Sequence, residues 1–160
     1  YRLINAVTLD SDIQLKDFST DIDGNSIESK SLRKIFILFM GRFVNTTPTQ
    51  PLCLLFNGGS AYQMYKTFSI TENAYYGFWI ESEKIISVSG KAVHKSTYPS
   101  TLLGNFNAET EVSQGLSANN SALYSDLSIE PIGNIKKITF GCFNGNNLMK
   151  SGSKIYLFGV

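Results

Sequence analysis

Aromatic side chains are the residue type in this chain best suited to bind a ligand. Seven of them fall between residues 62 and 79, among polar side chains. Exposed rings can stack on the apolar faces of sugars, while amide and carboxylate groups form hydrogen bonds with the sugar hydroxyls. We therefore predict a ligand-binding site formed by Tyr75, Tyr76, Glu72 and Asn73.

The same aromatic run must also supply part of a core, because alternate side chains of an extended strand point to opposite faces of a sheet. We expect Trp79 to pack in the core, and one or both of Tyr75 and Tyr76 to face a ligand. The polar stretch over residues 105–120 is a second candidate for recognition, as a long loop.

No residue pattern in the sequence indicates catalysis, so we predict a protein without enzymatic activity. His94, the only histidine, stands beside Lys91 and Lys95, which is typical of a surface residue. Glu81 and Glu83 lie two residues apart, on the same side of an extended segment. The paired carboxylates of a glycosidase must flank a sugar from opposite sides, about 5–10 Å apart. A solvated strand edge explains the two glutamates better.

The acidic segment over residues 21–25 resembles a calcium-binding loop only in part. An EF-hand loop needs glycine at its sixth position and a bidentate glutamate at its twelfth, and this chain has Ser26 and Leu32 there. An ordinary Asp-Gly turn is the simpler interpretation, and an irregular cation site is the alternative. No zinc-ligand spacing and no phosphate-binding glycine loop occurs. We therefore expect no metal and no cofactor.

The elements that must position these residues are short strands separated by Asn, Gly, Ser and Thr clusters. The chain contains no helical stripe. Pro48 and Pro51 are expected to bracket a turn, and residues 35–40 to form a strand covered on both faces. This pattern predicts an all-β fold, an antiparallel β-sandwich of jelly-roll type. The predicted strands cover residues 35–40, 52–56, 78–80, 84–89, 122–129, 136–143 and the C-terminal end.

Length and charge limit the classes of function. The 160 residues are expected to form a single domain over 1–160, with a net charge of +1 that recruits neither nucleic acid nor an anionic membrane. No apolar stretch is long enough to insert into a membrane. Acidic residues gather in residues 1–30 and lysines in residues 131–160. These are either two solvated faces, or edges through which copies of the chain meet.

The two cysteines lie far apart, at Cys53 and Cys142, each within an apolar run. Buried free cysteine behaves as a small hydrophobic residue. We expect reduced thiols, with a disulfide as the alternative.

Two motifs resemble those of a β-sandwich domain family found in virion proteins of tailed phages and prophages. The family has an "FNGD…Y" segment, which appears here as LLFNGGSAY over residues 54–62. It ends in "GS…LYG", which appears here within SGSKIYLFGV over residues 151–160. The family's aspartate is replaced by Gly59, so no role of that carboxylate carries over. Asn57, Gly58, Gly152 and Ser153 are expected to shape turns.

The resemblance implies a virion location, on the phage tail or the capsid exterior, and a homotrimer. The chain starts at Tyr1 without a methionine, consistent with the C-terminal part of a longer fibre or spike. We expect attachment to a host cell-surface glycan, through loops at one end of the sandwich. The alternative is a structural decoration or joining protein that binds other virion proteins and no glycan. A glycan depolymerase would need a pair of carboxylates in a cleft, and the sequence does not indicate one.

Overall fold

The chain forms antiparallel β-sheets, as predicted from the sequence, and the jelly-roll connectivity stays a prediction. The only helical element in the described part of the chain is the short 3-10 helix η1 (Ile27–Lys30). The computed structural model describes residues 1–44, 49–58, 62–69, 75–86, 92–97, 105–106, 113–114, 134–142 and 145–160.

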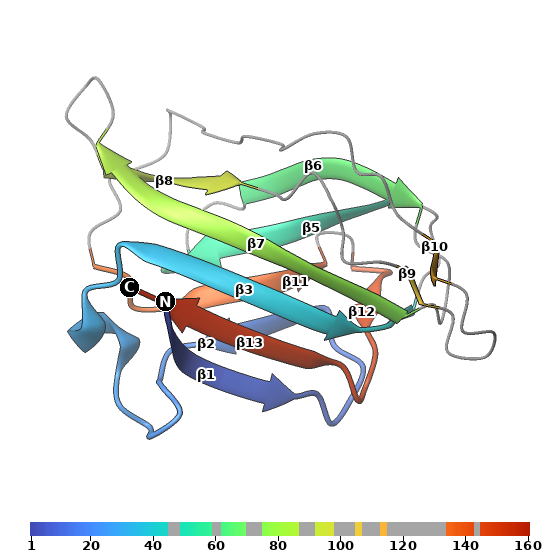
Figure 1. Cartoon of the computed structure of the whole chain (residues 1–160), viewed down its shortest axis with the longest axis horizontal. Helices are drawn as coiled ribbons and strands as arrows, with labels where there is room; N and C mark the ends of the chain where they lie inside the picture. Colours follow the sequence, from blue (N-terminus) through green and yellow to red (C-terminus); the bar gives the residue numbers. More distant parts are fainter. Residues whose placement is uncertain are drawn as a thin grey trace.

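Two main sheets lie one behind the other (Figure 1). Within the described residues, the large sheet has the spatial order β1 (Arg2–Thr8), β13 (Lys154–Gly159), β3 (Lys34–Gly41), β7 (Tyr75–Ile86), β9 (Asn105–Phe106) and β10 (Ser113–Gln114), with β8 (Ala92–Thr97) also paired to β7. The second sheet has the order β2 (Leu15–Phe18), β11 (Ile138–Cys142), β5 (Thr49–Phe56) and β6 (Tyr62–Ser69). A small pair joins β4 (Phe43–Val44) to β12 (Leu148–Met149).

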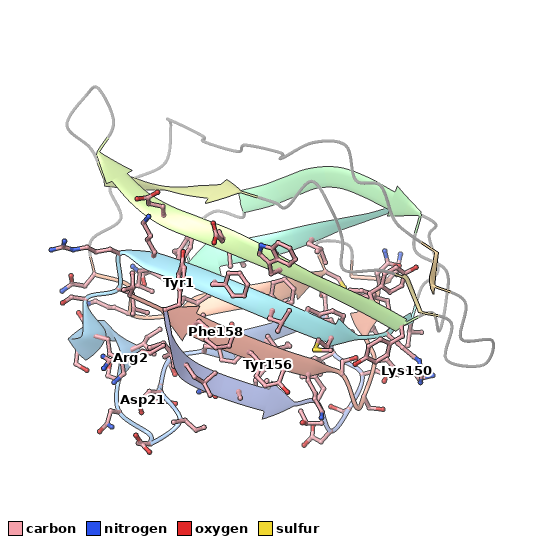
Figure 2. All side chains as sticks on the ribbon, viewed as in Figure 1. Tyr1, Arg2, Asp21, Lys150, Tyr156 and Phe158 are labelled. Atoms are coloured by element: carbon pink, nitrogen blue, oxygen red, sulfur yellow. The ribbon has the colours of Figure 1, made fainter. Side chains whose placement is uncertain are left out.

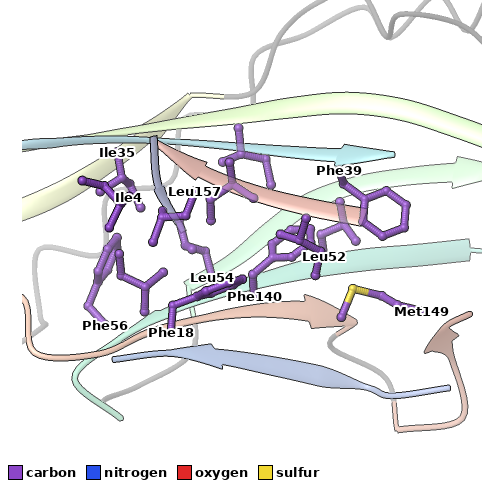
Figure 3. Packing of buried hydrophobic residues seen from close by; sticks show 14 of the residues in the cluster. Ile4, Phe18, Ile35, Phe39, Leu52, Leu54, Phe56, Phe140, Met149 and Leu157 are labelled. Carbon is purple, nitrogen blue, oxygen red and sulfur yellow. The ribbon is translucent and has the colours of Figure 1, made fainter. Parts of the chain in front are cut away.

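The core lies between the two main sheets (Figure 3). In β3 and β13 alternate residues are buried, as expected for strands with one face on a core. Phe39 of β3 stacks on Phe43, with ring centroids 4.9 Å apart, and meets Phe140 of β11 at 6.2 Å. These rings connect the sheets directly, and removing a ring buried in this way typically costs about 3–5 kcal/mol.

Each of the two motifs that resemble the phage domain family forms a turn, as the sequence predicted. Asn57 has a positive φ of 55°, and its Oδ1 accepts hydrogen bonds from the backbone N–H groups of Lys136 (2.6 Å) and Lys137 (3.2 Å). Ser153 is buried and its Oγ accepts a hydrogen bond from the Arg42 backbone N–H at 3.1 Å. Gly152 before it has a φ of 85°, in the region that favours glycine.

The acidic and basic segments predicted from the sequence meet inside one chain. Lys136 Nζ lies 3.5 Å from a carboxylate oxygen of Glu28, and Lys137 Nζ lies 3.7 Å from one of Asp17. At least part of the charge asymmetry is thus paired within the monomer.

Several local predictions were wrong. Pro51 lies inside β5 and not in a turn, next to an irregularity in the pairing with β6 between Gln50 and Leu52. A proline has no N–H to give to a ladder, so a bulge tolerates it. Residues 78–80 and 84–86 belong to one strand, β7. The β3 run is buried on one face only, since Met40 is exposed.

Two predicted features lie wholly or partly outside the described residues. The strand predicted over residues 122–129 cannot be compared with the structure. The stretch over residues 105–120, predicted as a loop, contains the two short strands β9 and β10.

Candidate functional site

The outer face of the large sheet, turned away from the core, carries a patch of aromatic and aliphatic side chains. Strand pairing places Tyr156, Leu38 and Trp79 in one row across β13, β3 and β7, and places Leu3, Phe158 and Phe36 in a neighbouring row across β1, β13 and β3. We call this patch the aromatic platform. It consists of Tyr1, Leu3, Phe36, Leu38, Met40, Trp79, Tyr156 and Phe158.

Phe36 is the hub of the aromatic platform. Its ring lies 5.7 Å from the Tyr1 ring, 6.2 Å from the Trp79 ring and 5.7 Å from the Phe158 ring, measured between centroids. The Trp79 ring is nearly parallel to that of Phe36, with an interplanar angle of 19°. Figure 2 shows Tyr1, Phe158 and Tyr156 on the same side of the sheet. The rings therefore support one another on a common surface.

The platform stays accessible to solvent although its rings cover one another. Tyr1, Leu3 and Met40 are 57%, 42% and 36% exposed, and the remaining members are half-buried. Apolar groups that stay together on a surface in this way mark interaction sites more often than isolated exposed residues do. A flat ligand or partner could contact several rings at once.

Polar groups border the platform at the end where Tyr1 lies. The Tyr1 phenol lies near the carboxylate of Glu81, which is opposite Phe36 in the neighbouring strand. Burial raises the pKa of Tyr1 above its usual value, and the negative charge of Glu81 adds to the rise. Next to them, Lys34 Nζ lies 3.2 Å from a Glu83 carboxylate oxygen. This end thus offers carboxylates, a phenol and an ammonium group to a ligand.

Arg42 and Tyr75 lie at the opposite end of the same face. Gly41, the last residue of β3, pairs with Tyr76 of β7. Since the strands are antiparallel, the residue after Gly41, Arg42, lies beside the residue before Tyr76, Tyr75. The Arg42 guanidinium carbon is 5.9 Å from the centroid of the Tyr75 ring, a distance that permits a cation–π interaction.

The predicted ligand-binding residues are separated by the structure. Tyr75 is half-buried on the outer face, as its prediction requires. Tyr76 is a core residue, 2% exposed, and its ring meets that of Phe43 at 5.9 Å, so the predicted ligand role of Tyr76 is wrong. Glu72 and Asn73 lie outside the described residues.

Trp79 was expected in the core and lies on the outer face instead. Ile80 takes the core position next to it and is fully buried. The sequence analysis identified the alternation along this strand but assigned the Trp79 indole to the core face instead of the outer face.

Sequence reasoning also missed the other members of the platform. Phe36, Tyr156 and Phe158 come from strands that are far from the aromatic run in the sequence. A signal was present, because residues 36, 38 and 40 and residues 156 and 158 are all apolar at positions that alternate with core residues. A strand with a solvated outer face normally carries polar residues there.

The Asp21 carboxylate forms an ion pair with the ammonium group of Lys30. Asp21 Oδ1 accepts hydrogen bonds from the backbone N–H groups of Asp23 (3.0 Å) and Asn25 (2.8 Å), and Oδ2 lies 2.6 Å from Lys30 Nζ. The Lys30 ammonium, together with these backbone donors, lowers the pKa of Asp21 to about 2. The part of the chain that the structure describes contains no cluster of three or more metal-ligating residues.

No helix among the described residues has the length and apolar character needed to span a membrane. Comparisons with protein-family models, with curated proteins and with solved structures each found no match to this chain.

Proposed function

We propose that this chain is a non-enzymatic virion domain of a tailed phage that attaches to a glycan on the host cell surface. The observation that carries the proposal is the aromatic platform, a contiguous set of partly exposed rings on the outer face of the large sheet. The virion setting rests on the two sequence motifs and their resemblance to phage domains.

The composition of the platform suits a sugar chain. Trp79, Tyr156 and Tyr1 give rigid aromatic area, and the tyrosines add hydroxyl groups that can bond to sugar hydroxyls. Glu81 and Lys34 at one end supply an acceptor and a donor. The sequence predicted attachment through loops at one end of the sandwich. The aromatic platform is now our candidate site, because its rings lie in contact on the outer face of the sheet.

Such a flat and open surface would bind a single saccharide chain weakly. Several copies on one appendage would raise the overall strength of attachment by avidity. We therefore retain the homotrimer as part of the proposal, with the platforms of three chains available to one cell surface.

A structural role in the virion is the second candidate. Leu3, Leu38 and Met40 lie within the platform, and aliphatic side chains contribute to protein contacts more than to sugar stacking. In this case another virion protein covers the outer face, and the domain decorates or joins the particle without binding glycan.

A binding assay on intact candidate host cells separates the two functions. We expect the wild-type protein to bind saturably, and mild periodate oxidation of the cell surface to abolish binding because it opens sugar diols. Trp79→Ala and Tyr156→Ala should each weaken binding about tenfold or more, as loss of a central aromatic contact commonly does.

Tyr76→Phe is the matched control, since it lies in the same strand as Trp79 but faces the core. It should bind cells like the wild type. Failure of a folded wild-type protein to bind any candidate host would remove the glycan proposal. Binding to purified virion proteins by the wild type but not by Trp79→Ala would then establish the structural role.

A further inference from the structure

The backbone of Arg42 is held from both sides at the corner that follows β3. Its N–H donates to Ser153 Oγ at 3.1 Å. Its carbonyl oxygen accepts hydrogen bonds from the Lys150 backbone N–H at 2.9 Å and from Ser153 Oγ at 3.3 Å. The neighbouring Gly41 has no room for a side chain, because a Cβ there would lie 2.1 Å from Ser153 Oγ. These hydrogen bonds fix the backbone of Arg42 and therefore the position of the Cα from which its side chain extends.

Among the described residues, no hydrogen bond and no ion pair is shown for the guanidinium group at the end of this side chain. Within the described part of the chain, its Nε is buried without a hydrogen-bond partner, and none of the ion pairs there includes Arg42. Most buried polar atoms in proteins are hydrogen-bonded, so such a donor calls for an explanation. An arginine offers five N–H donors in a rigid fork, a geometry that matches carboxylates and phosphates.

The Tyr75 ring orients this group on the outer face. The guanidinium lies over the ring at 5.9 Å, and Tyr75 and Trp79 alternate on the same face of β7. The two residues lie four positions apart along the strand, which corresponds to about 13 Å. A saccharide chain lying on Trp79 can therefore reach Arg42 only if it extends beyond a single sugar ring along the strand.

The charges of the platform differ between its two ends. Glu81 and Glu83 lie at the end near Tyr1, and Glu83 is paired with Lys34 there. Arg42 lies at the other end, beside Tyr75. An anionic group on the ligand is repelled at the glutamate end and attracted at the arginine end, so the platform gives a charged chain a preferred direction.

We propose that Arg42 and Tyr75 form an anion subsite for an acidic glycan, in which the guanidinium fork holds a carboxylate or phosphate substituent of the sugar chain. The proposal rests on the glycan-binding function above and adds the chemical class of the ligand. Carboxylate and phosphate share the paired oxygens that an arginine recognises.

The probe is surface polysaccharide extracted from cells that the protein binds, immobilised and titrated with wild-type protein. One sample has its carboxyl groups reduced to alcohols, a second is stripped of phosphate with aqueous hydrogen fluoride, and a third is untreated. We expect one of the two treatments to weaken binding at least tenfold, about the effect of losing a charged hydrogen bond. The treatment that does so identifies the anion.

Three variants locate the effect. Arg42→Met keeps an apolar stem beside Tyr75 but loses the guanidinium group. It should bind untreated polysaccharide as weakly as the wild type binds the sample from which the recognised anion has been removed. Arg42→Lys keeps the charge without the fork, and we expect it to recover only part of the binding. Arg2→Met removes an exposed cation from the β1 edge of the same sheet and should leave binding unchanged.

Equal binding of the wild type to all three polysaccharide samples would overturn the anion subsite while leaving glycan attachment intact. Equal losses in Arg42→Met and Arg2→Met would also overturn it, because they would indicate general charge attraction. Loss of binding by Trp79→Ala with no binding difference at Arg42 would support the platform alone. If wild-type protein binds no cells, the proposed function itself fails and the subsite fails with it. Thermal unfolding of each variant verifies that it is folded.

Discussion

The indole of Trp79 stacks on the ring of Phe36 with centroids 6.2 Å apart and an angle of 19° between the ring planes. Both side chains lie on the outer face of the large sheet, in neighbouring strands β7 and β3. The pair shows that Trp79 makes an aromatic contact outside the core. A ring on this face is available to a ligand or to a protein partner.

Removing Phe36 should affect binding and stability together. Phe36→Ala leaves Trp79, Tyr1 and Phe158 without their common neighbour, so their orientations are lost. We expect weaker cell binding and a loss of about 1–2 kcal/mol in the free energy of unfolding, below the 3–5 kcal/mol typical of a core phenylalanine. Urea unfolding measures the second quantity. A loss as large as that of Phe39→Ala would show that Phe36 belongs to the core in solution.

Asn57 should prove important to stability although its side chain is exposed. Its Oδ1 accepts two backbone hydrogen bonds, its Nδ2 donates to the Asn134 carbonyl at 3.1 Å, and its φ is positive. Asn57→Ala loses all three bonds and puts alanine, which tolerates the left-handed region less well than asparagine, at a positive φ, for a total cost of about 2 kcal/mol.

Two further substitutions at Asn57 separate these causes. Asn57→Asp keeps the acceptors and should cost least, and Asn57→Gly relieves the backbone but loses the bonds. Equal stability of Asn57→Ala and the wild type in urea unfolding would contradict a pinning role.

Acid should weaken the turn that Asp21 holds. The pKa of Asp21 is lowered to about 2, mainly by Lys30, from an ordinary value of 3.8. A lowered pKa in the folded state means that the ionised carboxylate stabilises the fold above about pH 4, and that this contribution disappears as the pH falls towards 2. We expect the difference in Tm between wild type and Asp21→Asn to shrink over that range. A constant difference from pH 6 to pH 2 would rule out the Asp21–Lys30 pair as its source.

The two cysteines should be unreactive thiols in the folded protein. Burial raises the pKa of Cys53 to about 11 and that of Cys142 to about 12, with a further rise at Cys142 from Cys53. Cys53 of β5 lies opposite Gly141 of β11, and Cys142 is the residue after Gly141. Because successive residues of a strand point to opposite faces, the two thiols lie on opposite faces of the sheet. Ellman's reagent at pH 8 should therefore label neither thiol until urea unfolds the chain. Rapid labelling of the native protein would show that one thiol is exposed.

The sequence was sufficient for the fold class and for the turns, and insufficient for the site. The alternation in residues 154–158 and the Asn-Gly and Gly-Ser turns depend on local chemistry, and the structure confirms them. The side of the sheet that Trp79 faces depends on register with β3, which is a long-range property. Tyr1, Phe36 and Phe158 come together only through the pairing of three strands. No spacing within one segment could have predicted that group.

Trp79 is the only tryptophan in the chain, so its fluorescence reports on the platform in the unmodified protein. The most direct test is a titration of wild-type protein with polysaccharide extracted from a bound host, following Trp79 emission and its quenching by acrylamide. Glycan attachment through the platform predicts a shift in emission and protection from acrylamide that saturate together with binding. Saturated binding with unchanged emission and unchanged quenching would place the ligand elsewhere and contradict the proposed site.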